Sequence, residues 1–126
     1  MKKVLVPFTD PHSGERALRC LLQEVRTEPF EVELLAVAEP LDLSNVHLFI
    51  SPQRAEQGAR AAAACWIAKL APLLQAANVP YHARVVIGHA PAEIEAALHR
   101  RDVDRVVLPA TAPRGSTAAP PVTVVA

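Results

Sequence analysis

The sequence predicts an α/β fold built on an open, parallel five-stranded sheet with helices on both faces. Short runs rich in valine and leucine alternate with amphipathic segments along the chain, as they do in βαβ units. Most of these runs lack polar alternation, which is typical of parallel strands buried on both faces. With 126 residues, 51% of them hydrophobic, the chain is long enough for one domain with a substantial core.

The first strand is predicted at residues 2–8, KKVLVPF, which are apolar and rich in valine. The segment TDPHSG (9–14) has the composition of a turn. A helix is predicted over residues 15–26, with Asp10 or Ser13 as its cap. Its apolar residues recur at helical spacing: Ala17, Leu18, Leu21, Leu22 and Val25.

A second strand is predicted at residues 31–40, and residues 41–50 follow as an irregular excursion without a clear period. A long helix then starts with Ser51 as its cap and Pro52 at the first helical position. Pro72 is expected to kink or interrupt this helix. The apolar stripe of the helix, which we expect to pack in the core, is Ala55, Ala59, Ala62, Trp66, Leu70, Leu73, Leu74 and Ala77.

The last part of the chain predicts two more strands around a short helix, and then a final strand. The strands are expected at residues 81–87 and 104–109, with the helix at 89–101 and the final strand at 122–126. Pairing of the final strand is left open by the sequence. It can lie parallel beside the fourth strand, pair antiparallel, or join the sheet edge of another subunit.

Composition excludes several classes of protein. Lysine plus arginine equals aspartate plus glutamate, 13 each, so the chain has no electrostatic footprint for nucleic acid or an anionic membrane. The longest apolar run, residues 61–68, is far shorter than the ~20 residues of a membrane span, and the N-terminus does not resemble a signal peptide. We therefore expect a soluble, cytoplasmic protein. Cys20 and Cys65 are expected to be buried, reduced thiols.

Four stretches resemble the universal stress protein family: VLVPFTDPHSGERAL, ELLAVAEP, VVIGHAPAEI and DRVVLPA, in this order. Gly88, Pro91 and Ile94 match the G-x-x-P-x-x-I element of that family. The resemblance implies one domain over residues 1–126 with the strand order 3-2-1-4-5. This is a Rossmann-like sheet of the adenine nucleotide alpha hydrolase-like type, usually found in homodimers. Ligands of such sheets bind at the carboxyl ends of the strands, here between the first and fourth.

Some members of the family bind ATP, and the resemblance implies candidate nucleotide-binding residues here. The acidic position after the first strand falls on Thr9, with Asp10 one place later, and Val37 matches a position that contacts adenine. Val37 is also readily explained as a core valine. Gly88 lies at the third strand-to-helix turn. The other candidates lie in the terminal segment: Arg114, Gly115 and Ser116.

The terminal segment departs from the family pattern. Pro109 and Ala112 stand where the first two glycines of the signature G-x2-G-x9-G-[S/T] are expected. Proline has no N–H to offer a phosphate, and alanine resists the left-handed conformations that glycine permits. Four residues between Ser116 and Pro121 are too few for the last helix of the family. We therefore expect a short, divergent member with a degenerate ATP-binding motif, in which residues 106–108 lose part of their cover.

These observations predict a non-enzymatic domain that acts in a stress response through homodimerisation or association with another protein. No cofactor is expected, ATP included. The alternative is an adenine nucleotide (ATP or AMP)-binding module that uses the candidate residues above. Catalysis ranks third, because Asp10, His12 and Ser13 lie too close together in sequence for the usual arrangement of a catalytic triad. The five histidines do not show the spacing of metal ligands.

Overall fold

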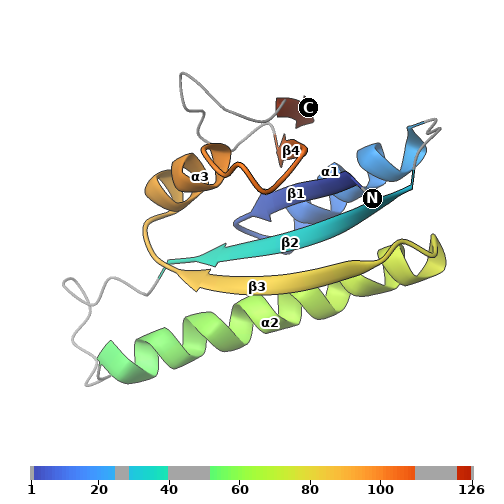
Figure 1. Cartoon of the computed structure of the whole chain (residues 1–126). Helices are drawn as coiled ribbons and strands as arrows, with labels where there is room; N and C mark the ends of the chain where they lie inside the picture. Colours follow the sequence, from blue (N-terminus) through green and yellow to red (C-terminus); the bar gives the residue numbers. More distant parts are fainter. Residues whose placement is uncertain (1, 25–28, 40–51, 110–121, 126) are drawn as a thin grey trace.

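The computed structural model of the chain describes residues 2–24, 29–39, 52–109 and 122–125. Strands and helices alternate through this part of the chain (Figure 1), as the sequence predicts. In order, the elements are β1 (Lys2–Phe8), α1 (Pro11–Gln23), β2 (Phe30–Ala38), α2 (Pro52–Ala76), β3 (Tyr81–Ile87), α3 (Ala90–Leu98), β4 (Arg105–Pro109) and β5 (Val122–Val125).

All of the strand pairs are parallel, which confirms the predicted architecture. The longer strands follow the order β3-β2-β1-β4, with β1 in the centre, and the short β5 pairs with β4. Val4 of β1 is in register with Val32 of β2 and with Arg105 of β4. Because every strand points the same way, the carboxyl ends gather at one edge of the sheet.

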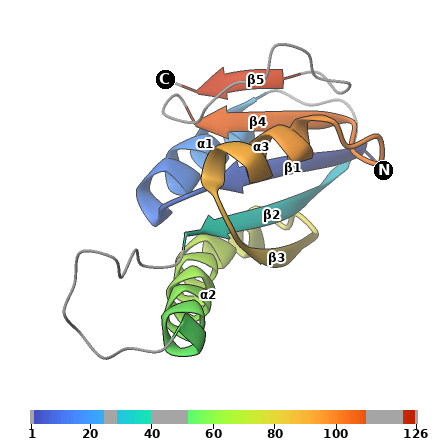
Figure 2. The same ribbon diagram turned by 90° about the vertical axis from the view of Figure 1, so that its left-hand side faces the viewer.

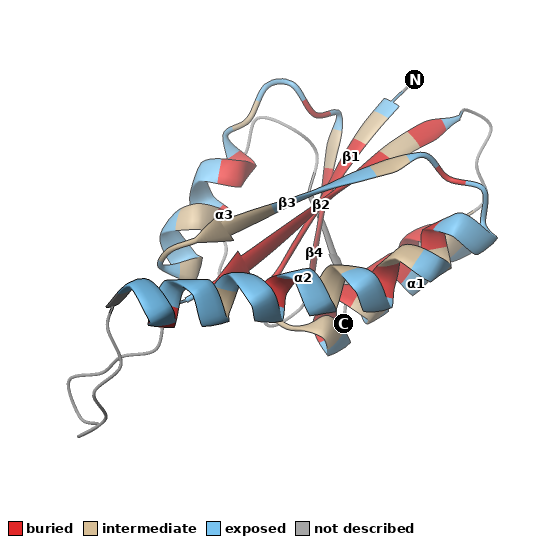
Figure 3. Cartoon of the chain, turned by 90° about the horizontal axis from the view of Figure 1, so that it is seen from below, coloured by how far each residue is buried: buried red, intermediate tan, exposed pale blue. Residues whose placement is uncertain are grey.

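Helices α1 and α2 cover one face of the sheet and α3 covers the other (Figure 2). Alternate residues of each strand therefore enter two separate cores. The core under α1 and α2 includes Val6, Phe8, Leu18, Leu34, Leu70 and Leu74. The core under α3 includes Leu5, Leu35, Val37, Ile94, Leu98 and Leu108. Figure 3 shows the contrast between the buried β2 and the partly exposed β3 at the edge.

The first helix starts earlier than the sequence predicts. Pro11 is its first residue and Asp10 caps it, so most of the predicted turn is helical. Proline suits this position because its fixed φ fits a helix and its missing N–H would have no helical partner. Gly14 then lets the helix approach the sheet closely. A Cβ there would lie 2.9 Å from Leu70 Cδ1 and 3.0 Å from Phe8 Cγ.

Two expectations about α2 and the cysteines are contradicted. Pro72 does not interrupt α2, because this proline is exposed and the helix bond that it lacks is lost on the solvent side. Cys65 is exposed and Cys20 is half-buried, although both were expected to be buried; both are free thiols. The apolar stripe predicted for α2 was also wrong at two positions, because Ala62 and Ala77 are exposed and Ala63 is buried instead.

The expected exposure of residues 106–108 is not found. Val106, Val107 and Leu108 are each at most 1% exposed. Val106 and Leu108 pack in the core under α3, and Val107 packs in the core under α1 and α2. The predicted excursion at 41–50, the cap Ser51 and the predicted loss of the last helix lie outside the described residues. No helix in the described ranges is long and apolar enough to cross a membrane.

Candidate functional site

The candidate site lies where β1, β2 and β3 end. Phe8 is in register with Ala36, and Val37 is in register with Val86. The structure therefore brings Thr9, which follows β1, and Gly88, which follows β3, to the same edge of the sheet as the end of β2. This is the edge at which open parallel sheets bind ligands.

The carboxylate of Asp10 is used within its own turn. Asp10 Oδ1 accepts a hydrogen bond from the backbone N–H of Ser13 at 2.8 Å, and Asp10 Oδ2 lies 3.0 Å from Ser13 Oγ. Both oxygens thus hold the first turn of α1. Thr9 is half-buried beside this cap. Of the two candidates after β1, Asp10 has a clear structural role as the N-cap.

Val37 and Gly88 also have structural roles. Val37 is 1% exposed and packs in the core under α3. The N–H of Gly88 donates to the carbonyl of Ala38 at 3.0 Å, so it extends the pairing of β3 with β2. A Cβ at Gly88 would lie 2.7 Å from Glu93 Oε1. The turn therefore has little room for a side chain at this position as long as Glu93 keeps its place.

The N-terminus of α3 is capped from β2. Glu39 Oε1, directly after β2, accepts a hydrogen bond from the N–H of Ala90 at 2.7 Å and lies 3.1 Å from His89 Nδ1. Backbone N–H groups at a helix start attract anions, because they have no partner inside the helix. Here a carboxylate of the same chain occupies one of them, so an external phosphate would compete with Glu39 at this point.

No catalytic relay or metal cluster is present in the described part of the chain. His12 is exposed, and its side chain makes no hydrogen bond with any described residue. Ser13 Oγ bonds to Asp10 alone among these residues, so a Ser–His–Asp relay is not formed. The described residues contain no group of three or more histidine, cysteine or acidic side chains placed to hold a metal ion. Arg114, Gly115 and Ser116 lie outside the described ranges.

A pocket of about 460 Å³ lies on the α2 side of the end of β2. This pocket was not predicted from the sequence, which indicated a ligand site between β1 and β4. Its volume falls in the range of small-molecule sites. Small side chains of α2 form most of its wall, and Trp66 closes one part: the lining is Ala38, Glu39, Arg54, Ala55, Gly58, Ala59, Ala62 and Trp66. The helical spacing of these small residues was the available signal.

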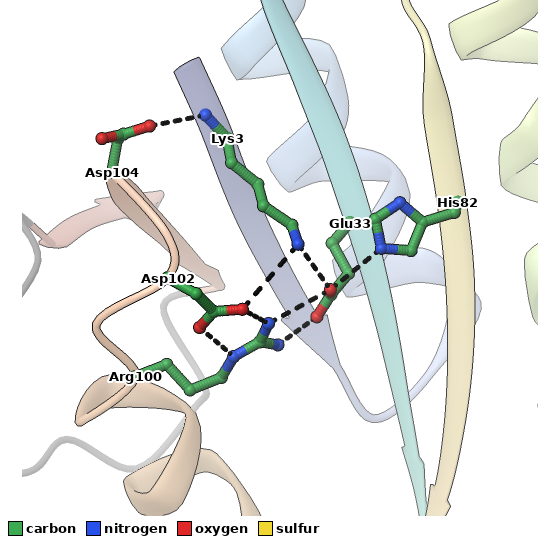
Figure 4. Close-up of polar contacts among 6 residues, drawn as sticks. All are labelled: Lys3, Glu33, His82, Arg100, Asp102 and Asp104. Carbon is green, nitrogen blue, oxygen red and sulfur yellow. Dashed lines mark hydrogen bonds and ion pairs between the residues drawn. The ribbon is translucent and has the colours of Figure 1, made fainter. Parts of the chain in front are cut away.

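A second polar group, here called the Glu33 cluster, lies on the α3 face nearer the amino ends of the strands (Figure 4). Glu33 is 1% exposed. Its carboxylate bonds to both terminal nitrogens of Arg100, lies 3.0 Å from His82 Nε2 and lies 3.5 Å from Lys3 Nζ. Asp102, the fifth member, pairs with the other side of the Arg100 guanidinium. The cluster joins β1, β2, β3 and the segment between α3 and β4.

Charges in the Glu33 cluster shift the pKa of its carboxyls. Burial alone raises the pKa of Glu33, but hydrogen bonds from Arg100 and His82 and the charges of Arg100 and Lys3 outweigh it, so the pKa lies below its usual value. Hydrogen bonds from Arg100 lower the pKa of Asp102 to about 2. Both carboxylates are ionised at neutral pH. The cluster therefore links three strands and the segment before β4 by ion pairs on the face opposite α1 and α2.

Comparisons with known proteins agree with this architecture. A sequence profile described as the universal stress protein family matches residues 1–119. Three similar solved structures are universal stress protein UspA from Lactobacillus plantarum, a universal stress protein family protein from Burkholderia pseudomallei, and one from Arabidopsis thaliana with AMP bound. Sequence identities are 18%, 14% and 20%, and TM-scores are 0.71, 0.71 and 0.63.

The alignments cover 99%, 98% and 99% of this chain and 97%, 95% and 91% of those chains, in the same order. At these identities the likeness concerns the fold alone. No curated protein matches the sequence.

Proposed function

The chain belongs to the universal stress protein family, and on this premise we propose that it is a non-enzymatic domain that acts through homodimerisation or protein association. Family-type ATP binding has no part in this role. The proposal treats residues 1–126 as one cytoplasmic domain of the stress response, with β5 as a full member of the sheet order 3-2-1-4-5 and a degenerate ATP-binding motif.

One observation carries the proposal. Pro109 is the last residue of β4, and the family resemblance of the sequence places it where nucleotide-binding members have the first glycine of their signature. Proline cannot donate a backbone hydrogen bond to a phosphate. Asp10 adds support, because both of its carboxylate oxygens are engaged with Ser13. The edge that would hold a nucleotide thus lacks one donor and has its acidic side chain in use.

A second candidate function is adenine nucleotide binding. The observation that favours it is the similar fold of the Arabidopsis protein with AMP bound. Thr9, Val37 and Gly88 lie at the ends of three neighbouring strands, and Arg114, Gly115 and Ser116 complete the candidate set in the terminal segment. In this alternative the base would lie near Val37 and the phosphates near the terminal segment.

Millimolar ATP is expected to change the melting temperature by less than about 1 °C, as measured by differential scanning fluorimetry with equal magnesium in the control. A site at 100 times its dissociation constant would add about 2.7 kcal/mol, or roughly 10 °C for a domain of this size. AMP is tested in parallel. A large shift with either nucleotide that disappears in Asp10→Asn, which keeps a capping oxygen, would establish the second candidate instead.

The purified chain is expected to have twice its 13.5 kDa mass at micromolar concentration, as measured by light scattering. Support comes from its net charge of zero, which favours self-association, and from the homodimers common in the family. The exposed apolar surface that was expected at β4 gives no support for a dimer, because residues 106–108 are buried. A dilution series serves as the control. A monomeric mass at all concentrations would exclude homodimerisation and leave association with a different protein.

A further inference from the structure

Strand β3 has an open edge. Among the strands that the structure describes, it pairs with β2 and with no other strand. His82, Ala83 and Arg84 in the first half of β3 are exposed, whereas all seven residues of β2 from Val32 to Ala38 are buried (Figure 3). Helix α2 packs under one face of β3 and leaves Ala83 exposed. An open edge of this kind can pair with another extended chain.

The hydrogen bonds to β2 show which backbone groups face outward. The N–H of Val32 donates to the carbonyl of Pro80, and the N–H of Gly88 donates to the carbonyl of Ala38, both at 3.0 Å. In a parallel ladder the bonding residues of one strand alternate, so even-numbered residues of β3 face β2. The N–H and C=O groups of the odd-numbered residues therefore face the open side: Tyr81, Ala83, Val85 and Ile87.

The open strand is also positively charged. Arg84 is exposed, and its side chain makes no ion pair or hydrogen bond with the described residues. Strand β3, YHARVVI, has no acidic residue, and the β2 partner of Arg84 is the apolar Leu35. The nearby carboxylate of Glu33 already bonds to Arg100 and His82. Nothing in the described part of the chain neutralises Arg84.

We propose that the edge of β3 binds an extended, acidic segment of another protein by strand addition. Backbone bonds to Ala83 and Val85 would provide the affinity. An acidic side chain directly opposite Arg84 would share its face of the sheet and lie within reach of its guanidinium. Apolar side chains at alternate positions would extend the face that packs on α2.

The same features make a second copy of the chain a poor occupant. Edges are commonly blocked by proline, bulges or charged side chains, and β3 carries no proline and no glycine. The charge of Arg84 does not block every strand, but it disfavours a positively charged partner strand and favours an acidic one. Two β3 strands paired antiparallel about this residue would place two arginines opposite each other, which is unfavourable. The charge therefore rejects a like strand and accepts an acidic one.

The test uses the full chain and a synthetic octapeptide of alternating valine and glutamate. Amide hydrogen exchange by NMR should show fast exchange at Ala83 and Val85 in the free protein and slower exchange at Arg84 and Val86. Saturating peptide should slow Ala83 and Val85 by about tenfold or more, since strand pairing protects these amides. A peptide with lysine in place of glutamate is the control and should give no protection.

Two variants make the test specific to this edge. Ala83→Pro removes an outward donor without removing a bond to β2, and should weaken peptide binding about tenfold in fluorescence anisotropy, whereas Ala83→Val keeps the donor and should not. Arg84→Glu should weaken binding about tenfold and favour the lysine peptide. Unchanged affinity in both Ala83→Pro and Arg84→Glu overturns the proposal. So does protection of Ala83 and Val85 in the free protein that rises with its concentration, which would identify a second copy.

Discussion

Replacing Arg100 with methionine is expected to destabilise the fold by about 2–3 kcal/mol at neutral pH. The guanidinium makes two contacts with the Glu33 carboxylate, which is 1% exposed. Without it, the charge of Glu33 is left with Lys3 at 3.5 Å and the half-exposed His82. A buried charge that loses its main partner is costly, and Arg100 itself is 20% exposed, so solvent reduces the loss below that of a fully buried pair.

The loss of stability in Arg100→Met should also depend on pH. In the natural chain the pKa of Glu33 is below its usual 4.5, so its stabilisation is complete above about pH 4.5 and is lost as the pH falls through the lowered value. Without Arg100, burial dominates and the pKa of Glu33 rises. The variant then regains stability on protonation, and the difference between the two proteins should be smaller at about pH 4 than at neutral pH.

Urea unfolding at the two pH values measures both effects, and a double variant supplies the control. In Glu33→Leu with Arg100→Met, no charge is left buried, and we expect most of the lost stability to return. Equal losses in the single and double variants would show that the stem of Arg100, and not its charge, supports the fold. A loss that is the same at both pH values would contradict the assigned shift in the pKa of Glu33.

The order of strands and helices could be predicted because it depends on local patterns. The runs at 2–8 and 81–87 coincide with β1 and β3, since each contains a valine-rich apolar segment that ends at turn residues. The start of α1 could be narrowed only to Asp10 or Ser13, because both residue types cap helices. The structure identifies Asp10 as the cap, because its two carboxylate oxygens accept hydrogen bonds from the N–H and the hydroxyl of Ser13.

The Glu33 cluster could not be predicted, because its members are distant in sequence. Glu33 lies 49 residues before His82 and 67 before Arg100. Only the parallel register, in which Glu33 is the partner of His82, brings the first two together. The local signal was Glu33 in the otherwise apolar run 32–38, but β2 also contains Glu31, and the sequence alone predicts an exposed position for either glutamate. The partners of Glu33 depend on strand order, which local patterns do not specify.

The wrong expectation at residues 106–108 has a similar cause. That expectation assumed that each part of the sheet is covered by a single helix, so that a missing helix would leave the valines of β4 exposed. In the structure Val106 packs with Leu5 and Ile94 in one core, and Val107 packs in the other. In a twisted sheet, one helix can pack against residues of several strands. The least covered strand of the four longer ones is β3, and the inference about its edge rests on that difference.

Replacing Phe8 with alanine is expected to destabilise the fold by about 4 kcal/mol and to lower the melting temperature by roughly 12 °C. Phe8 is 1% exposed and ends β1, directly before Thr9. Its ring lies against the space that Gly14 leaves open, and its centroid is 6.4 Å from that of Trp66. Truncation would remove apolar contacts with α1 and α2 at once and leave a cavity that the sheet cannot close.

The same variant reports on the pocket, because Trp66 is part of its lining and is the one tryptophan of the chain. Loss of the Phe8 ring should let water reach the indole and shift its emission to longer wavelength. Phe8→Leu, which fills most of the volume, should cost about 1 kcal/mol and leave the emission nearly unchanged. If Phe8→Ala and Phe8→Leu lose the same stability, the shape of the aromatic ring matters more than its volume. If Phe8→Ala unfolds like the natural chain, Phe8 does not join β1 to the two helices, and the pocket wall is held by α2 alone.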